Sequence, residues 1–417
     1  MGLLRITCVL AICAIAIPAA ASTLLVPDSF PSIADALAVA APGDSVVLAN
    51  GTYYERDLDL VSGITLASES GDPSTVTIDG EYLGRIMQCE SLTEPSVVRG
   101  ITFTHGVSGH EDGGAVYCHT ADVTFSDVVF RANGTYAYGG AVYCLGGAFV
   151  FERVTFMSNG AYFEGQGGAL FSRQCTPCIV DCHFEDNEAE FGGAIGGLIA
   201  SNPEVENSTF IGNTALMDGG AVYVGSAGGG YSGVSFVGNT AGREGGAVRA
   251  SNGCSFEDSV FIGNSAVDGG GFACLTCNPQ FVNVTFYGNS ATGKGGGIYA
   301  WYSDPWLAKV IVAFSSDGEG LCCEYNSEPV IICCDVFGNA DGDYAGGIPD
   351  YTGIAGNISE DPEFCDAPSG DLGLHESSPC AAANSECGEL VGAHDVACSA
   401  PTAIEEMSWG KLKALYR

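Results

Sequence analysis

The sequence has few basic residues. Among its 417 residues, 14 Lys and Arg stand against 50 Asp and Glu, which gives a formal net charge of -36 at pH 7. A surface of this sign repels the phosphates of nucleic acids and the headgroups of anionic membranes. It also repels acidic polysaccharides unless cations lie between the two. We therefore expect no nucleic-acid partner.

Long apolar runs are missing beyond the first 21 residues. Residues 1–21 have the pattern of a secretory signal: Arg5 gives a positive start, residues 6–17 an apolar core, and residues 19–21 a small-residue cleavage site. The alternative, a membrane anchor, requires a longer apolar run. We expect a mature chain that begins near Ser22, has no transmembrane span, and is secreted or held at the cell surface.

Motifs of common catalytic sites are absent from the sequence. It has no Gly-x-Ser-x-Gly, no phosphate-binding loop, and no metal-ligand spacing among its six His. Two Cys-x-x-Cys motifs occur, at 175–178 and 274–277, but they lie about 99 residues apart and cannot share one zinc ion. Stacked carboxylates could meet the spacing of a glycosidase by geometry alone, so that signal is unspecific. We therefore name no catalytic residue.

Glycine, by contrast, is abundant: 60 residues, many of them in a repeated pattern. Glycine pairs begin at positions 113, 139, 167, 192, 219, 245, 269 and 295. A second phrase, Phe-x-x-Asn, ends at Asn133, Asn159, Asn187, Asn213, Asn239, Asn264 and Asn289. Successive asparagines lie 26, 28, 26, 26, 25 and 25 residues apart, and such a period is typical of a solenoid whose repeats pack on their neighbours.

Each repeat reads as a coil of β-strands. Short runs rich in Val, Ile, Phe and Tyr are cut by Gly and Asn, and no ten-residue window inside the repeats keeps a helical period. An apolar residue also lies five positions before each motif Phe, so we infer a bend that turns both columns inward. About 26 residues then form one coil of three short strands, and the coils stack at roughly 4.8 Å. The asparagines would form a buried structural column that satisfies backbone groups at one corner.

The two phrases carry a family resemblance. Gly219-Gly220-Ala221-Val222, followed by Phe236-Val237-Gly238-Asn239, resembles the repeat of chlamydial-type polymorphic outer membrane proteins. More broadly, it is similar to right-handed parallel β-helix proteins of the pectin-lyase-like group. The resemblance covers roughly residues 100–340 and implies an all-β, right-handed parallel β-helix of about 10–12 coils at the cell exterior or outer membrane. A shared fold does not decide a function.

The chain divides by composition. After the signal, we expect an N-terminal cap and irregular first coils over 22–106, β-helix repeats over 107–345, and C-terminal coils with a cap over 346–400. A short helix over Ser32–Ala41 would cover the open apolar end of the first coil. Residues 401–417 form a tail, which is either disordered or a sorting segment.

The strand after each glycine pair carries the first candidate site. Its fourth position is always apolar and should face inward, so alternation turns the fifth position outward. Six of the fifth positions carry an aromatic ring or a guanidinium: Tyr117, Tyr143, Phe171, Tyr223, Arg249 and Tyr299. A solvent-exposed aromatic stripe usually marks a binding site, and we expect this one to stack on sugar rings. The alternative is a Tyr ladder that only shields the sheet.

The residue before each glycine pair carries the second candidate site. Asp218, Glu244 and Asp268 should lie on consecutive coils, at steps of roughly 4.8 Å. Like charges this close either raise a pKa or recruit a cation such as calcium. The alternative is three carboxylates in solvated turns.

Cysteine is abundant, with 17 residues after the signal sequence. In an exported chain this number indicates disulfides. Cys118 and Cys144 each lie five positions after the first glycine of their pairs, so they should stack one coil apart, within reach of a disulfide. The alternative is a ladder of buried free thiols.

Two classes of function remain. The first is a non-catalytic, monomeric solenoid with an adhesin-like, glycan-binding or envelope-structural role, whose partner is a polysaccharide or a cell-surface glycan. Its support is the regularity of the repeats, which leave no singular site. The second is a carbohydrate-active enzyme, either a polysaccharide lyase or a glycoside hydrolase, which only the resemblance in fold supports.

Overall fold

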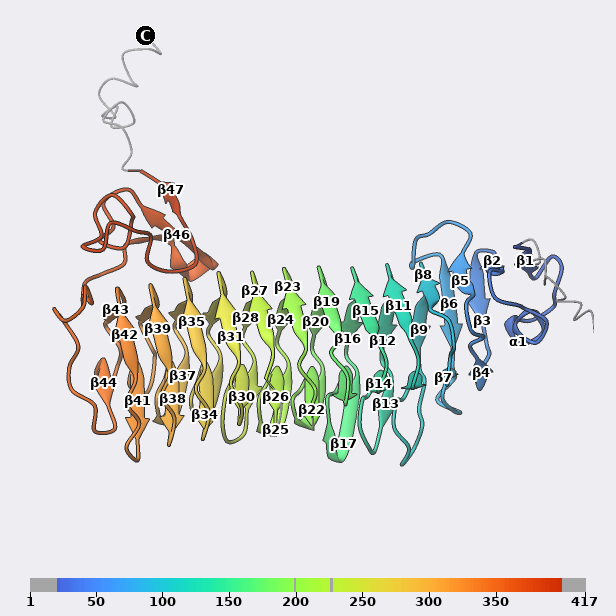
Figure 1. The fold of residues 1–417 in the computed structure, drawn as a ribbon, viewed down its shortest axis with the longest axis horizontal. Helices are drawn as coiled ribbons and strands as arrows, with labels where there is room; N and C mark the ends of the chain where they lie inside the picture. The colour runs from blue at the N-terminus through green and yellow to red at the C-terminus, as the bar shows by residue number, and fades with distance from the viewer. Residues whose placement is uncertain (1–20, 199, 226–227, 400–417) are drawn as a thin grey trace, which may run out of the picture.

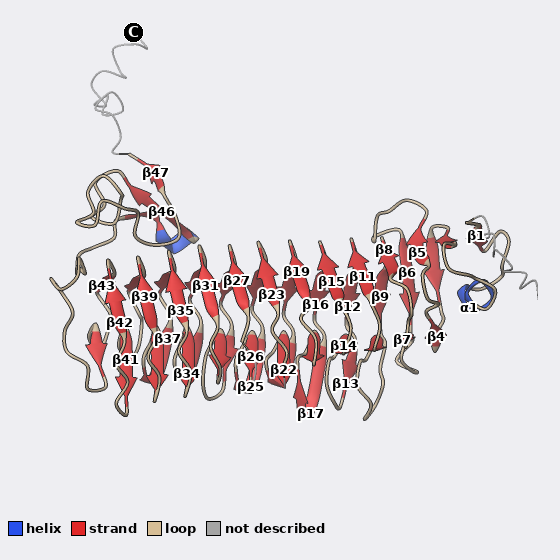
Figure 2. Cartoon of the chain, in the orientation of Figure 1, coloured by secondary structure: helices blue, strands red, loops and turns tan. Residues whose placement is uncertain are grey.

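The repeats fold into a parallel β-helix, in which each coil adds one strand to each of three long sheets (Figure 1). The computed structural model describes residues 21–198, 200–225 and 228–399. Almost all of the predicted signal sequence and the predicted tail therefore lie outside the described residues. The predicted all-β class is confirmed, and helix is confined to two short segments of the described chain (Figure 2). Neither of them is long and apolar enough to cross a membrane.

The three long sheets contain 13, 12 and 12 strands, so the expected 10–12 coils were slightly too few. Sheet A runs from β1 (Thr23–Val26) to β42 (Val330–Ile332), sheet B from β3 (Gly51–Tyr53) to β43 (Asp335–Phe337), and sheet C from β4 (Leu58–Asp59) to β44 (Tyr344–Ala345). A fourth sheet of seven strands, sheet D, runs from β13 (Gly134–Thr135) to β37 (Ser290–Lys294). Within the repeats, the chain visits sheets C, A, B and D in that order.

The glycine pairs form the corner between sheets D and C. At Gly219, φ is +70°, and a Cβ atom would lie 2.3 Å from the carbonyl oxygen of Val222. At Gly220, a Cβ atom would lie 2.0 Å from the carbonyl oxygen of Gly246 on the next coil. Only glycine fits either place, because both contacts are with backbone.

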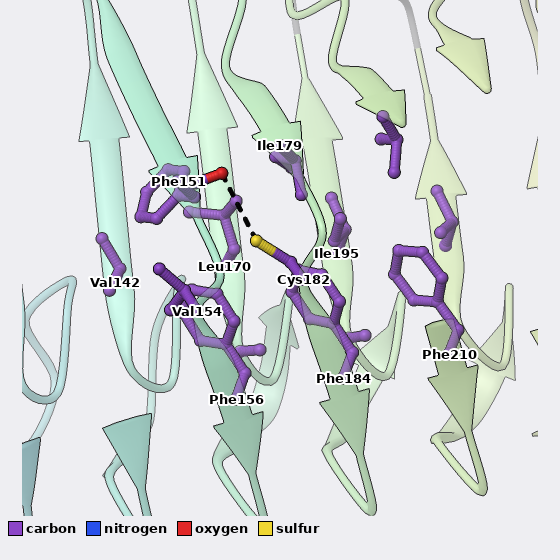
Figure 3. Close-up of a cluster of buried hydrophobic side chains, with 14 of the residues drawn as sticks. Val142, Phe151, Val154, Phe156, Leu170, Ile179, Cys182, Phe184, Ile195 and Phe210 are labelled. Carbon is purple, nitrogen blue, oxygen red and sulfur yellow. Dashed lines mark hydrogen bonds between the residues drawn. The ribbon is translucent and has the colours of Figure 1, made fainter. Parts of the chain in front are cut away.

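Phenylalanine rings fill the interior in continuous stacks. Phe156, Phe184 and Phe210 pair in register across sheet B and are fully buried. Ring centroids lie 4.8 Å apart between the first two and 4.6 Å apart between the last two, with nearly parallel planes (Figure 3). Burial of each such side chain contributes roughly 1.5–3 kcal/mol, which makes these columns the main hydrophobic term of the solenoid.

The asparagine column lies buried at the corner after sheet B. The Nδ2 of Asn213 donates to the carbonyl oxygen of Phe184 at 3.0 Å and to Oδ1 of Asn239 at 3.0 Å. Its own Oδ1 accepts from the backbone N–H of Asn187 at 3.0 Å and from that residue's Nδ2 at 2.9 Å. Each asparagine therefore bonds both neighbouring coils, and the same pattern runs from Asn133 to Asn289.

The N-terminal helix is shorter than the sequence suggested. Helix α1 spans Ile33–Leu37, and the N–H of Asp35 donates to Oγ of Ser32, its N-cap, at 3.1 Å. The predicted end at Ala41 is wrong because proline follows at 42, and the residue before a proline disfavours the helical conformation. Ile33 and Leu37 are buried in the main core, so the helix covers the first coil as expected.

The C-terminal part divides into two pieces. Tyr344, Ile348 and Tyr351 pack against the end of the main core. A small sheet of β45 (Phe364–Asp366), β46 (Asp371–His375) and β47 (Val396–Cys398) instead lies beside the last coils (Figure 1). We call residues 364–398 the C-terminal unit.

The C-terminal unit covers the outer face of β40 (Ile311–Ala313) in sheet B. Its Leu374 and Val391 pack on the outward side chains of that strand. Two disulfides hold it: Cys333–Cys387 joins it to the solenoid, and Cys365–Cys398 closes it internally. The other cysteines of the described chain are free thiols.

A buried carboxyl lies where the C-terminal unit meets the solenoid. Asp335 is fully buried, and its Oδ1 accepts the N–H of Glu360 at 3.1 Å. Its Oδ2 lies 3.2 Å from Sγ of Cys380, which donates to it. Burial raises the pKa of Asp335 to about 7. Burial therefore favours the protonated carboxyl, against the two hydrogen bonds, which favour the carboxylate.

Replacement of Asn213 by Ala should lower the free energy of unfolding by about 1–3 kcal/mol, because it leaves the buried backbone N–H of Asn187 without its acceptor and removes the side-chain bonds to Phe184 and Asn239. Urea denaturation measures this loss. The control is Asn50→Ala, at an exposed asparagine, which should change stability by less than about 0.5 kcal/mol. Equal effects of the two variants would contradict the role of the column.

The stability of the C-terminal unit should fall as the pH rises through about 7. A carboxyl whose pKa is raised on folding binds its proton more tightly in the folded state and so stabilises it. This stabilisation is complete below the pKa of the unfolded chain, about 3.9, and is lost as the pH rises to the pKa of the folded protein, about 7. Asp335→Asn, which cannot ionise, should remove that dependence from thermal unfolding between pH 5 and 8. Asp350→Asn is the control, because that carboxyl is exposed. Parallel pH profiles for wild type and Asp335→Asn would refute the assignment.

Candidate functional site

The predicted stripe on sheet C is a continuous ladder at its N-terminal end. Tyr117, Tyr143 and Phe171 are register partners on β10 (Val116–His119), β14 (Val142–Leu145) and β18 (Leu170–Arg173). The first two rings lie 5.4 Å apart with planes at 7°, and the next two lie 5.4 Å apart at 13°. Gly196 interrupts the ladder before Tyr223.

The expectation that this stripe faces open water is wrong. Tyr143 is 4% exposed, and Phe171 and Tyr299 are also buried. The reason is that stacked rings at coil spacing cover each other's faces. Tyr138 also stacks on Phe171 at 4.7 Å. The stripe is therefore a shielded ladder over most of its length.

Arginines cover the half-buried members of the stripe. The guanidinium of Arg85 lies 5.1 Å from the ring centroid of Tyr117, and that of Arg249 lies 5.3 Å from the ring centroid of Tyr223. Such cation–π contacts stabilise the pair but occupy the face that a sugar would need.

The three predicted carboxylates lie on consecutive coils, where backbone bridges join Asp218 to Glu244 and Glu244 to Asp268. The chain supplies its own counter-charges. Nε of Arg243 donates to Oδ1 of Asp218 at 2.7 Å, and Nε of Arg249 lies 3.5 Å from Oε2 of Glu244. Burial, and then the charge of Asp218, raises the pKa of Glu244, and burial also raises the pKa of Asp268.

This arrangement does not form the expected calcium site. Arg243 holds both oxygens of Asp218, which is 1% exposed, so that carboxylate is not free to bind a cation. In the described ranges, no group of His, Cys, Asp and Glu has an arrangement that could hold a metal ion. The cysteines of the two Cys-x-x-Cys motifs are among the residues to which this applies.

Cys118 and Cys144 are register partners, as the spacing predicted, but the predicted disulfide is not formed. Both thiols are buried and free, and Cys89 extends the column by one coil. In-register parallel strands hold equivalent Cβ atoms about 4.8 Å apart, whereas a disulfide requires about 3.5–4.5 Å. The column is therefore a ladder of thiols.

A group of exposed tyrosines, which the repeat pattern did not indicate, surrounds a pocket of about 310 Å³ at the N-terminal edge of sheet D. Tyr82, Tyr136 and Tyr162 are 60%, 44% and 42% exposed. We call this the aromatic pocket; its other lining residues are Val107, Ala132, Asn133, Gly134, Thr135 and Ser158.

The pocket is hollow because two successive coils have glycine where later coils have larger residues. Gly134 and Gly160 are register partners, and the column continues with Glu188 and Thr214. The ring of Tyr162 lies over both glycines: its Cε2 would be 3.7 Å from a Cβ atom on Gly134. A larger residue at Gly160 would push this ring out of place, because its Cβ atom would overlap the phenolic oxygen of Tyr162, whereas a Cβ atom on Gly134 would make an ordinary contact with the ring.

A bulge in β17 (Gly160–Gln166) forms one wall. Phe163 and Glu164 both have positive φ, +54° and +64°, so the strand turns outward there. The backbone N–H of Glu164 donates to Oε2 of Glu190 on the next coil at 2.7 Å, which anchors the turn. Phe163 is exposed and packs edge-on against Tyr136 at 5.2 Å.

The sequence contains a signal for this bulge. Eight positions separate Asn159 from Gly167, against five or six between asparagine and glycine pair in the other coils. Insertions in a solenoid project from one face, so the interval of 28 marked the exceptional coil. Tyr82 carried no such signal because it precedes the regular repeats.

A second, polar pocket of about 340 Å³ adjoins the first. Its lining residues are Arg85, Glu90, His110, Glu111, Asp112 and Tyr117. The two pockets meet where the ring of His110 lies 5.3 Å from that of Tyr136. Burial raises the pKa of Asp112, whereas Glu90 and Glu111 are exposed.

Comparison with known proteins supports the repeat. The Chlamydia polymorphic membrane protein repeat matches residues 207–225 and 283–300. No curated protein matches the chain.

Several solved structures have a similar fold. The PL6 family alginate lyase AlyGC is 13% identical with a TM-score of 0.48, and the match covers 94% of this chain and 58% of that one. The alginate lyase AlyF-OU02 is 12% identical with a TM-score of 0.47, over 92% and 97% of the two chains. The A-module of the Azotobacter vinelandii mannuronan C-5 epimerase AlgE6 is 13% identical with a TM-score of 0.35, over 79% and 93%. At these identities the likeness concerns the fold alone.

The two kinds of tyrosine should respond differently to truncation. Tyr143→Ser removes a buried, stacked ring and should lower the free energy of unfolding by about 2–4 kcal/mol. Tyr82→Ser removes an exposed ring and should change it by less than about 0.5 kcal/mol. Chemical denaturation of both variants measures the difference. A stable Tyr143→Ser protein would mean that the ladder is open to ligands after all.

Proposed function

We propose that this parallel β-helix protein, which carries polymorphic-membrane-protein repeats, binds glycans at the aromatic pocket without transforming them. The observation that carries the proposal is the exposure of three tyrosine rings around one hollow, in a solenoid whose phenylalanine ladders are buried. Exposed aromatic groups of this kind on a soluble chain usually mark an interaction site.

The chemistry of the pocket suits a saccharide. The C–H faces of a pyranose ring pack on tyrosine rings, while phenolic hydroxyls at the rim reach its oxygen atoms. Gly134 and the Ser158 hydroxyl lie at the pocket surface, so a sugar can approach backbone there. A volume of about 310 Å³ is at the lower end of small-ligand sites, which suits part of a chain rather than a whole large ligand.

A binding role is favoured over a catalytic one by what lines the pocket. Its described lining contains no carboxylate, histidine, lysine or arginine, so the carboxylate pair of a glycosidase is missing from it and the tyrosine hydroxyls are its only titratable groups. The alternative of a polysaccharide lyase or glycoside hydrolase therefore stays a prediction. The predicted signal sequence and the repeat similarity support a place outside the cell, in secreted form or at the cell surface, and glycan binding there suits an adhesin-like role.

Loss of the tyrosine walls should abolish binding but not folding. The double variant Tyr136→Ala/Tyr162→Ala removes most of the stacking surface and should weaken glycan binding by at least about tenfold. A glycan array identifies ligands for the wild-type protein, and isothermal titration measures the affinity of each variant. Circular dichroism and the melting midpoint should be nearly unchanged, because both rings are exposed.

The matched control is Tyr325→Ala, an equally exposed tyrosine near the other end of the solenoid. It should bind as the wild type does. If the wild type binds no glycan on the array, or if Tyr136→Ala/Tyr162→Ala retains full affinity, the proposed function is wrong.

A further inference from the structure

The aromatic side chains of the pocket follow the solenoid axis. Four strands are neighbours in sheet B and therefore belong to four consecutive coils: β6 (Val76–Asp79), β9 (Thr102–Thr104), β12 (Val129–Arg131) and β16 (Thr155–Met157). One ring follows each strand, in the order Tyr82, His110, Tyr136 and Tyr162. Ring centroids lie 5.3 Å apart between His110 and Tyr136, and 6.3 Å apart between Tyr136 and Tyr162. Three coil steps span about 14 Å, so these rings offer a track for several sugar units rather than a socket for one.

Carboxylates border this track at one end. Glu90, Glu111 and Asp112 line the polar pocket. Only Arg85 among its described lining residues carries a permanent positive charge, and that charge is already engaged. Its Nη2 donates to Oε2 of Glu111 at 3.0 Å and to the carbonyl oxygen of Asp112 at 2.8 Å, and its Nε donates to the carbonyl oxygen of Gly113 at 3.1 Å.

Carboxylates also border the other end. Glu164 and Glu188 are exposed beside the β17 bulge, and Glu190 accepts the bond that anchors it. Burial, and then the charge of Glu188, raises the pKa of Tyr162, which places that charge close to the wall of the pocket.

Other cations offset these charges only in part, since the charge of Arg173 acts on Asp112 but two nearby arginines are placed elsewhere. Nη1 of Arg56 lies 4.0 Å from Oε2 of Glu81, and Arg131 is exposed on sheet B but lines neither pocket. An anionic chain laid along the track would therefore meet an excess of carboxylates over free cations beside His110 and beside Tyr162, within a protein that is strongly acidic overall.

We infer that the ligand is an uncharged oligosaccharide that lies along the solenoid axis, and that the bordering carboxylates exclude polyuronates. This inference rests on the proposed function, since it names the class of glycan that the aromatic pocket accepts. It sets this chain apart in specificity from the alginate-directed enzymes that share its fold, because alginate is a polyuronate. Repulsion of unlike partners is an ordinary source of specificity at binding sites.

The test uses pairs of oligosaccharides that share a backbone and differ only at C6. Oligomers of glucose, galactose and mannose are compared with the matching oligomers of glucuronate, galacturonate and mannuronate, from two to six units long. Isothermal titration is run in 10 mM and in 150 mM salt, where the Debye length is about 30 Å and about 8 Å. A variant with Glu90→Gln/Glu111→Gln removes two exposed carboxylates without touching the tyrosines.

We expect three results. In the pair that binds, the uncharged member should bind at least about tenfold more tightly at 10 mM salt. This difference in affinity should be smaller at 150 mM salt and in the Glu90→Gln/Glu111→Gln variant. Affinity for the uncharged member should rise with chain length until the oligomer spans the track.

Other results would overturn it. Charge does not select the ligand if a uronate oligomer binds as tightly as its uncharged counterpart, or if neither salt nor the glutamine substitutions change the difference in affinity between them. In either case, loss of binding by Tyr136→Ala/Tyr162→Ala would still identify the aromatic pocket as a glycan site. If no oligomer of either kind binds the wild type, the inference is overturned, and the glycan array decides separately whether the proposed function is wrong.

Discussion

In-register stacking of parallel strands is the constraint on which this structure depends. Because each coil repeats the previous one at the strand spacing, equivalent residues form columns, and a column is stable only when its members suit one another. Phe184 and Phe210 satisfy this by ring stacking, and Asn187 and Asn213 by hydrogen bonds from coil to coil. Carboxylates that would repel one another in a column need a cation from outside that column, as Arg243 provides for Asp218.

The same constraint separates structural aromatic residues from accessible ones. A ring inside a column is covered on both faces by its neighbours, which is why Tyr143 is buried although its strand position points outward. In the aromatic pocket, rings are exposed where the columns are broken by glycines and by an inserted bulge. Tyr136 and Tyr162 lie at such a break, beside Gly134 and Gly160, so irregularity in a solenoid is the feature that best marks a site.

Stacking also explains where the disulfides occur. Equivalent cysteines on adjacent coils, such as Cys118 and Cys144, face the same way at a fixed spacing and remain thiols. The two bonds instead involve the C-terminal unit, where the chain leaves the repeat and side chains can approach from different directions. That unit covers the outer side of β40 and places Asp335 in a dry interface.

The repeat period, the inward phenylalanines and the asparagine column could be read from the sequence, because a column demands the same residue at the same interval in every coil. The two-residue insertion before Gly167 was also present in the numbers, although only the structure gave it meaning. Tertiary structure alone decided the burial of Tyr143, the pairing of Asp218 with Arg243, and the meeting of Tyr82 with the later coils. These depend on which neighbour covers which side chain across coils, and no repeat interval carries that information.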